Sequence, residues 1–253
     1  MNPRPHSDTQ ARLEGFEARL QDAFHWANTH AREIVLGAGL LLVIGGIVAG
    51  VFEWRRRGIE AAETELAQID TSFANAMGAS PGEYFVPEPA NSEQATKARE
   101  AAVAELDAFI AKHGSSQISA IAGIKAAELE VDLGKLDAAD PRLQKIADSL
   151  AADDPRRAIA LRLRGYTLDQ RNQPLQAGET YEAAAKVTGY PPRALAWIEA
   201  GDAYSRAKAP DRAIAAYREV LAGWPDLAEQ ERIVQRIGVE QASLDAAAAA
   251  EKK

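Results

Sequence analysis

The side chains that could carry out chemistry are few and lie far apart in the sequence. The 253 residues include no cysteine, which excludes disulfides, thiolate metal sites and cysteine nucleophiles. The histidines, which show no metal-ligand spacing, are His6, His25, His30 and His113. Asp153 and Asp154 precede Pro155, an order typical of a helix N-terminus and not of an acid–base pair. No glycine-rich phosphate loop, G-x-S-x-G or H-E-x-x-H motif occurs. We therefore predict no catalytic, cofactor or metal site, and a chain that is not an enzyme.

The composition favours helices and an acidic surface. Hydrophobic residues make up 47% of the chain and aromatic residues only 6%, which suits helix-on-helix packing better than a β-sandwich. The formal net charge is −8. From residue 58 onward there are 22 basic and 31 acidic residues, a net charge of −9. Because such a domain repels phosphate backbones, we expect no nucleic acid among its partners.

One segment departs from the pattern of a soluble domain. Residues 34–52 are 19 consecutive residues without a charge. A helix of that length spans roughly 30 Å, about one hydrocarbon core. We predict a single transmembrane anchor in membrane lipid over 34–54, with Trp26 and Trp54 near the two interfaces. The alternatives are a buried helix of a soluble domain and a cleaved signal peptide, and the length of the run fits both less well.

Two features of the anchor bear on its assembly and orientation. Gly46 and Gly50 form a G-x-x-x-G pair, which permits close association of membrane helices and a homo-oligomer. Arg19 and Arg32 precede the anchor and three arginines at 55–57 follow it. A long domain can cross the membrane against so small a difference, so the charges leave a periplasmic or a cytoplasmic repeat domain open.

The pattern of hydrophobic residues divides the chain into four regions. These are a tail with an amphipathic helix at 1–33, the anchor at 34–54, a divergent helical hairpin with a proline-rich loop at 55–115, and helix-hairpin repeats with a capping helix at 116–250. Within the repeats, turns at Gly134, Asn172–Pro174 and Lys208–Pro210 separate paired helices, and the capping helix runs over about 226–248.

The sharpest repeat lies near the C-terminus. Its key positions are Trp197, Gly201, Tyr204, Ala213, Tyr217 and Pro225. Small residues at Gly201 and Ala213 let two helices cross closely, aromatic rings fill the space around the crossing, and Pro225 ends the second helix. This spacing resembles the tetratricopeptide repeat (TPR) pattern, W-x2-L-G-x2-Y, then A-x3-F, then P. Gly165 lies 36 residues before Gly201 and indicates a second copy, and a looser copy precedes it. The resemblance implies an all-α fold with a TPR-like α-solenoid of antiparallel helix hairpins, which here follows the single N-terminal transmembrane helix predicted from the apolar run.

The whole layout resembles membrane-anchored proteins of the YfgM type from bacterial envelopes. The residues that carry this resemblance are Glu53-Trp54-Arg55, the stretch 109–115, and Leu133-Gly134-Lys135-Leu136 with Ala139. The resemblance implies a single-pass inner-membrane protein whose repeat domain faces the periplasm. It also implies association with the secretion translocon or with periplasmic chaperones.

In a stack of TPR-like hairpins, the first helices line a binding surface. By analogy with TPR grooves, the residues expected to contact a protein partner are Arg162, Tyr166, Asp169, Ile198, Asp202 and Ser205. The Lys-then-Asn pair with which chaperone-adaptor repeats hold a terminal carboxylate is absent, since Tyr166 follows Arg162 by four residues. The sequence therefore predicts a membrane-tethered scaffold for protein–protein interactions in the cell envelope. The alternative is a structural, homo-oligomerising subunit of a larger membrane assembly.

Overall fold

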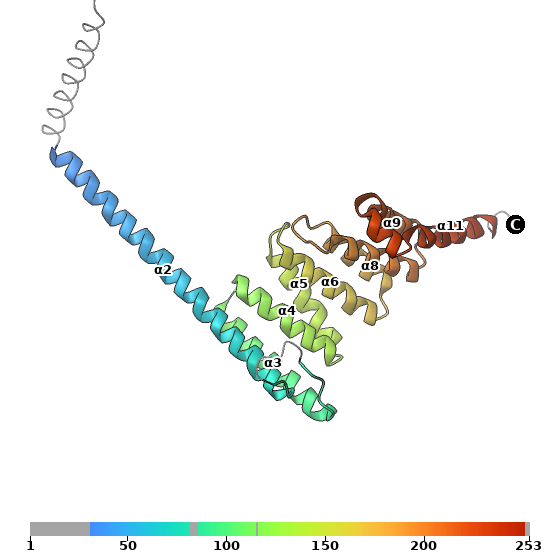
Figure 1. The fold of residues 1–253 in the computed structure, drawn as a ribbon, viewed down its shortest axis with the longest axis horizontal. Helices are drawn as coiled ribbons and strands as arrows, with labels where there is room; N and C mark the ends of the chain where they lie inside the picture. The colour runs from blue at the N-terminus through green and yellow to red at the C-terminus, as the bar shows by residue number, and fades with distance from the viewer. Residues whose placement is uncertain (1–30, 81–85, 115, 251–253) are drawn as a thin grey trace, which may run out of the picture. The chain divides into compact units, whose positions relative to one another are not determined.

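A computed structural model describes residues 31–80, 86–114 and 116–250, with the side chains of 31–49 and 55 outside the description. The chain divides into two units, residues 1–60 and 61–253. The described residues form helices joined by turns and loops, with no strand among them (Figure 1). The helices are α2 (Ala31–Ala76), α3 (Ser92–His113), α4 (Gln117–Asp132), α5 (Leu136–Ser149), α6 (Pro155–Gln170), α7 (Pro174–Ala185), α8 (Arg193–Arg206), α9 (Pro210–Gly223), α10 (Pro225–Gln230) and α11 (Ile233–Ala250).

Helix α2 runs without interruption through the predicted boundary between anchor and hairpin at 54/55. The segment contains no proline that would end a helix. Glu53 also pairs with Arg56 and Arg57 one turn later, at 3.4 and 2.9 Å, which supports the helix across that boundary. The end of the apolar run is therefore a change of side-chain type within one helix and not a break in the backbone.

The predicted anchor falls mostly on residues whose side chains lie outside the description. The backbone of 34–54 is helical, whereas Gly46 belongs to the part without described side chains. Gly50 is exposed, and a Cβ built on it would meet no atom within 4 Å. In the part of the chain that the structure describes, no helix has both the length and the apolar character of a membrane span. The predicted amphipathic tail at 1–33 lies outside the described residues up to residue 30.

The second half of α2 and α3 form the first hairpin of the 61–253 unit. Asn91 caps α3, since its side-chain oxygen accepts a hydrogen bond from the Glu93 N–H at 3.0 Å. Leu66 of α2 and Phe109 of α3 lie in one buried cluster, which continues to Ala122 of α4. This hairpin therefore stacks on the repeats through an apolar interface.

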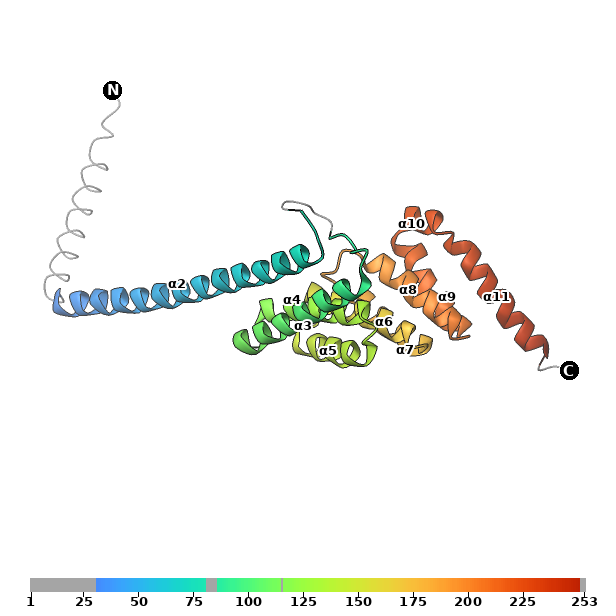
Figure 2. The same ribbon diagram turned by 90° about the horizontal axis from the view of Figure 1, so that it is seen from below.

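Three hairpins follow, and we refer to α4–α5, α6–α7 and α8–α9 as the first, second and third repeats (Figures 1 and 2). The first helix of each ends at a left-handed residue. These residues are Gly134, Asn172 and Lys208, with φ of 70°, 60° and 56°. At this conformation the chain folds back on the helix end, so that Ala209 N–H donates to the Tyr204 carbonyl at 2.9 Å. The turns expected from the sequence thus correspond to one recurring helix ending.

Close contact between a glycine and a tyrosine ring fixes the crossing of the two helices in the second and third repeats. A Cβ added to Gly165 would lie 2.7 Å from the ring of Tyr181, and one added to Gly201 would lie closer still to the ring of Tyr217. Because real Cβ atoms do not approach that closely, only glycine permits this distance between the helix axes.

Tyr204, the last motif residue of α8, was expected to pack within its own hairpin. It also contacts the preceding repeat. Tyr204 lies over Gly178 of the second repeat, where an added Cβ would lie 2.6 Å from its ring. Its hydroxyl donates to the Glu182 carboxylate at 2.6 Å. Arg212 covers the ring at 4.3 Å from its centroid. Tyr204 therefore joins neighbouring repeats, in addition to filling its own hairpin.

In the first repeat, an ion pair stands where the third repeat has the contacts of Tyr204. The first repeat therefore lacks the motif's tyrosine, and its sequence matches the pattern only loosely. Glu130, only 4% exposed, lies 38 residues before Leu168 and takes the corresponding place. Arg142 of α5 donates to both of its carboxylate oxygens, at 2.7 and 3.0 Å, and also to Asp107 of α3 at 2.7 Å. Because Arg142 binds both oxygens, the buried carboxylate of Glu130 has the hydrogen bonds that it would otherwise lose on leaving water.

The C-terminal helix is split in two, in contrast to the single helix predicted over about 226–248. Helix α10 ends at Gln230, and Arg232 has a φ of 52°, which turns the chain before α11 begins. Helix α11 then packs against α9 through Ile233 and Ile237. Its Gly238 lies 37 residues after Gly201, so α11 occupies the place of a fourth first helix. No atom lies within 4 Å of a Cβ built on Gly238, so no ring fills this position.

This comparison predicts opposite effects for one substitution at two equivalent glycines. Gly201→Ala should lower the free energy of unfolding by about 1–3 kcal/mol, because the new methyl group overlaps Tyr217. Gly238→Ala should raise it by about 0.5–1 kcal/mol, because alanine favours a helix interior and the space is open. Urea titration followed by circular dichroism measures both. Equal destabilisation by the two variants would contradict the proposed role of the glycine–tyrosine contact.

Candidate functional site

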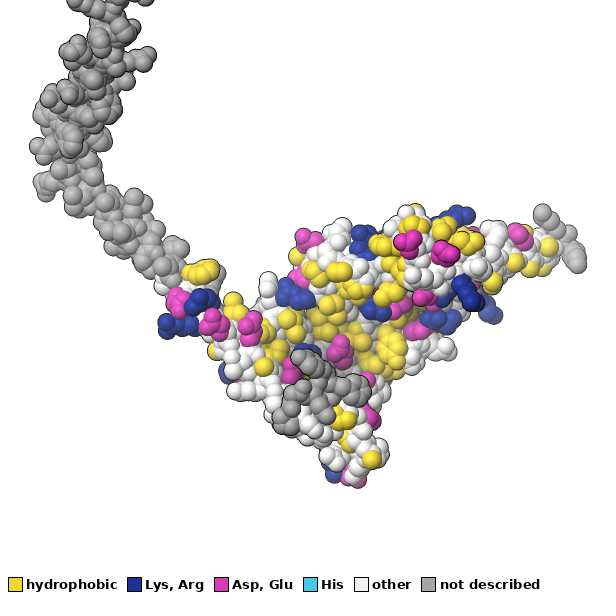
Figure 3. All heavy atoms as spheres, in the orientation of Figure 1, with side chains coloured by type: hydrophobic (Ala, Val, Ile, Leu, Met, Phe, Trp, Pro, Cys, Tyr) yellow, Lys and Arg dark blue, Asp and Glu magenta, His cyan; other side chains and the backbone are white. Residues whose placement is uncertain are grey.

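The candidate site is the surface formed by α4, α6 and α8, which we call the first-helix face. Three exposed aliphatic residues occupy equivalent places on it, 38 and 36 residues apart. They are Ile121, Ile159 and Leu195, with 38, 41 and 40% of their surface accessible. Figure 3 shows hydrophobic side chains gathered around α4 and α6 in this view. One exposed aliphatic side chain on each first helix gives a regular apolar row, a feature that marks interaction surfaces.

Four of the six residues predicted to contact a partner are engaged within the chain. They lie between successive first helices, with α11 as the last. The contacts are Arg162–Glu199 at 2.6 Å, Asp169–Arg206 at 2.7 Å, Asp202–Arg236 at 2.5 Å and Ser205–Glu240 at 2.5 Å. We call this series the polar ladder. It aligns neighbouring repeats, so these side chains serve first in packing the solenoid.

The other two predicted contact residues differ from one another. Ile198 is 6% exposed and belongs to the core, in contrast to the outward position expected for it, because the helix turns it towards the neighbouring helices. Tyr166 is 45% exposed and stays accessible on the first-helix face.

The residues predicted to pack the third repeat lie together. Trp197, Tyr204, Ala213 and Tyr217 share one buried cluster. Gly201 lies beneath Tyr217, as described above. Pro225 is the first residue of α10, immediately after the Trp224 cap that closes α9. These residues are structural and leave the accessible chemistry to the first-helix face.

A hollow of about 370 Å³ lies on that face, and we call it the tyrosine hollow. Its lining residues come from α4, α6, α7, α8 and the α7–α8 loop. They are Glu128, Ile159, Arg162, Leu163, Tyr166, Tyr181, Tyr190 and Glu199. Aromatic rings, aliphatic side chains and carboxylates thus converge on one accessible space, which is the composition expected of a binding site.

Two polar groups in the tyrosine hollow lack partners within the described part of the chain. Glu128 is exposed on α4 at the edge of the hollow, and it makes no hydrogen bond or ion pair there. Desolvation raises the pKa of its carboxyl above the ordinary 4.5, and Asp132 raises it further while Lys125 opposes the shift. Tyr181 is 5% exposed as a residue, and its hydroxyl makes no hydrogen bond to a described residue and borders the open hollow. Burial also raises the pKa of the Tyr181 phenol. The hollow therefore contains an acceptor and a hydroxyl that the protein itself leaves unused.

Glu128, Tyr190 and Glu199 were not among the residues predicted for the site. Glu128 lies 38 residues before Tyr166, which lies 36 before Asp202, so all three occupy equivalent places on the first helices. Extending the repeat register into the first repeat would have identified Glu128. Tyr190 lies in the loop before α8, and no periodic pattern indicates its position.

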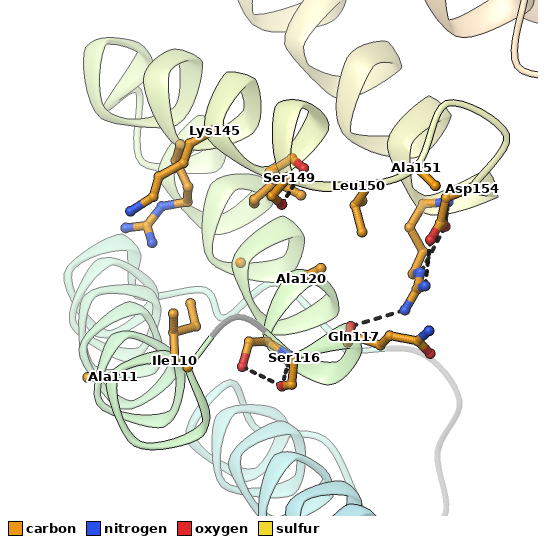
Figure 4. A pocket seen from close by; sticks show the side chains of 16 residues that line it. Ile110, Ala111, Ser116, Gln117, Ala120, Lys145, Ser149, Leu150, Ala151 and Asp154 are labelled. Atoms are coloured by element: carbon orange, nitrogen blue, oxygen red, sulfur yellow. Dashed lines mark hydrogen bonds and ion pairs between the residues drawn. The ribbon is translucent and has the colours of Figure 1, made fainter.

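A second cavity of about 630 Å³ lies among α3, α4 and α5 (Figure 4). Ser149, Leu150 and Ala151 line one side of it, and Ser116 and Gln117 line the other. Its origin is a loss of large side chains in the first repeat. Where the later repeats have Arg157 and Arg193, this repeat has Ser119. Where they have Leu161 and Trp197, it has Gly123. In the later repeats the two arginines cap α5 and α7, for example by donating to the Ala185 carbonyl at 2.8 Å.

The described residues include no group of three or more metal-ligating side chains that could hold an ion. Stacked helix hairpins with an apolar row and a hollow on one face define a helical-repeat binding protein. The chain matches the model of the tetratricopeptide repeat-like domain over residues 25–237, and it belongs to that family. TPR-like repeats generally mediate protein–protein interactions.

One solved structure is similar in outline. It is a crystal structure of nearly identical TPR-like repeats described as a kinesin light chain of Podosopora anserina. The two chains are 17% identical with a TM-score of 0.47, and the match covers 59% of this chain and 83% of that one. At this level the likeness carries no argument about function. No curated protein matches the chain.

The raised pKa of Glu128 predicts a stability change with a definite pH dependence. Since the folded chain holds the proton more tightly than the unfolded chain, the charged carboxylate disfavours folding at neutral pH. Because Glu128 is exposed and solvent screens its charge, Glu128→Gln should raise the urea midpoint at pH 7 only slightly. This gain should fade as the pH falls through the raised pKa and below 4.5, where Glu128 is protonated in both states.

The matched control is Glu219→Gln, which alters another exposed glutamate, on α9 and outside the tyrosine hollow. It should give no comparable gain at pH 7. A lower urea midpoint for Glu128→Gln at pH 7 would show that the carboxylate stabilises the fold, contrary to this prediction.

Proposed function

We propose that the chain is a membrane-tethered scaffold of the bacterial cell envelope that binds other proteins through its first-helix face. The observation that carries this proposal is the exposed apolar row beside the tyrosine hollow, on a family of repeats that generally mediate protein–protein interactions. The polar ladder supports the same role, because its ion pairs align neighbouring first helices and with them the residues of the row. The proposed role is binding, without a chemical reaction.

The proposed tether is the segment 34–54, and its support is the uncharged run of 19 residues in the sequence. The resemblance to YfgM-type proteins favours the inner membrane, with the repeat domain in the periplasm and the translocon or periplasmic chaperones as partners. Tethering raises the effective concentration of the repeat domain near other membrane proteins. A modest affinity at the first-helix face would therefore suffice.

Photo-crosslinking in cells tests which face binds. A benzophenone amino acid in place of Ile159 or Leu195 should crosslink a distinct partner, identified by mass spectrometry, because both positions are exposed on the first-helix face. The matched controls are Leu175 on α7 and Leu221 on α9, which are similarly exposed at 46 and 40%. Crosslinks confined to these second-helix positions would contradict the proposal. A crosslink of two copies of the chain would instead favour the homo-oligomerising role considered for Gly46 and Gly50.

Membrane extraction tests the tether independently. The chain should stay in the membrane pellet after alkaline carbonate treatment, whereas a Leu42→Arg/Ile44→Arg variant should be released, since each central arginine costs about 2.5–3.5 kcal/mol on insertion scales. A reporter that is active only in the periplasm, fused after Lys253, should be active. Release of the unaltered chain by carbonate would contradict the tether, and an inactive reporter would contradict the orientation.

A further inference from the structure

The tyrosine hollow lies at the place that, one repeat later, is filled by a contact between the third repeat and α11. In the third repeat the Tyr217 hydroxyl donates to Asp202 at 2.6 Å, and Arg236 of α11 pairs with Asp202 at 2.5 Å. Arg236 also lies 6.0 Å from the centroid of the Tyr217 ring. A tyrosine, a carboxylate and a cation thus satisfy one another.

The second repeat has the same positions with different residues. Tyr181 lies 36 residues before Tyr217, and Glu199 lies 37 residues before Arg236. Beside the third repeat, the next first helix, α11, places the cation of Arg236. Beside the second repeat, the next first helix, α8, places the carboxylate of Glu199 instead. The Tyr181 hydroxyl accordingly makes no hydrogen bond to a described residue and borders the open hollow.

The charges that line the hollow favour a cation. Glu128 and Glu199 contribute two negative charges and Arg162 one positive charge, and Arg162 already pairs with Glu199 at 2.6 Å. Lys125, the nearest cation on α4, pairs with Asp70 of α2 at 2.6 Å. Glu128 therefore makes no direct ion pair and feels Lys125 only at a distance, in a part of the chain that carries a net charge of −9 from residue 58 onward. A positively charged partner matches both the hollow and its surroundings.

The remaining lining residues suit a long, basic side chain. The ring of Tyr166, which is 45% exposed, can contact an ammonium or guanidinium group through its face, whereas Tyr181 and Tyr190 are each 5% exposed and form the buried wall behind it. Ile159 and Leu163 offer an apolar wall to its methylene groups. The apolar row lies on the neighbouring helices and can take hydrophobic residues that flank the basic one.

We propose that the tyrosine hollow binds a lysine or arginine side chain of a partner protein segment in which the basic residue is flanked by hydrophobic residues. Its cation pairs with Glu128 and lies against Tyr166, and its stem packs on Ile159 and Leu163. The inference rests on the proposed function, because it names the chemistry of the segment that the first-helix face recognises. It goes further than the proposed function because it places the recognition of a basic side chain in the tyrosine hollow and assigns the pairing charge to Glu128.

Fluorescence anisotropy with the full chain in detergent tests this. The probe is a blocked, fluorescein-labelled peptide of alternating leucine and lysine, and the matched probe carries acetyl-lysine, which keeps the stem and removes the charge. The lysine peptide should bind about tenfold more tightly than the acetyl-lysine peptide at moderate salt. Glu128→Gln should weaken its binding about fivefold and remove most of this preference. Tyr166→Ala should weaken binding about threefold to fivefold, while Tyr166→Phe retains it.

The control is again Glu219→Gln, which removes one acidic charge from α9. It should leave binding unchanged. Equal weakening by Glu128→Gln and Glu219→Gln would show general attraction to an acidic surface and overturn the inference, as would equal binding of the two peptides. Circular dichroism melts of each variant establish that it is folded. Crosslinking from Leu195 reports on the proposed function separately, because it can persist when the preference for lysine is absent.

Discussion

The close approach of a glycine and a tyrosine ring is the constraint on which the rest of the structure depends. It sets the crossing of α6 with α7 at Gly165 and of α8 with α9 at Gly201. Tyr204 on Gly178 uses the same contact to join one repeat to the next. Because interiors pack at nearly crystalline density, these contacts define how far apart neighbouring first helices lie. The position of every side chain on the first-helix face follows from that spacing.

The polar ladder is a consequence of this spacing and has limited energetic weight of its own. Partly exposed ion pairs such as Asp169–Arg206 contribute roughly 0–1 kcal/mol each. Their value lies in alignment, because a carboxylate and a guanidinium meet only when the two helices have the correct register. The ladder also occupies polar side chains that would otherwise be free, which restricts the accessible chemistry of this face to the apolar row, Tyr166 and Glu128.

Where the chain departs from the repeat pattern, it leaves a charged group without an ion pair or a space without a side chain. Glu128 makes no direct ion pair and has a raised pKa, so its charge lowers the stability of the folded chain slightly at neutral pH. Natural proteins retain such local costs where a site requires them. Gly123 and Ser119 open the cavity beside α3 for a related reason, the absence of side chains that the later repeats supply. At α11 the glycine position recurs, and no ring of the described residues lies above it.

The sequence alone determined the helical class, the paired helices, the turns at Gly134, Asn172 and Lys208, and the residues that pack around Gly201. These follow from local rules, since helical periodicity, turn residues and a fixed repeat length act over fewer than about 40 residues. Only the tertiary structure decided that α2 continues past residue 54, that Ile198 is buried, and that Arg162 pairs with Glu199. It also decided that Glu128 and Tyr190 border the same hollow as Tyr166. Such contacts depend on the distance and rotation between successive hairpins, and these are set by packing across the interfaces and not by the residues of any one helix.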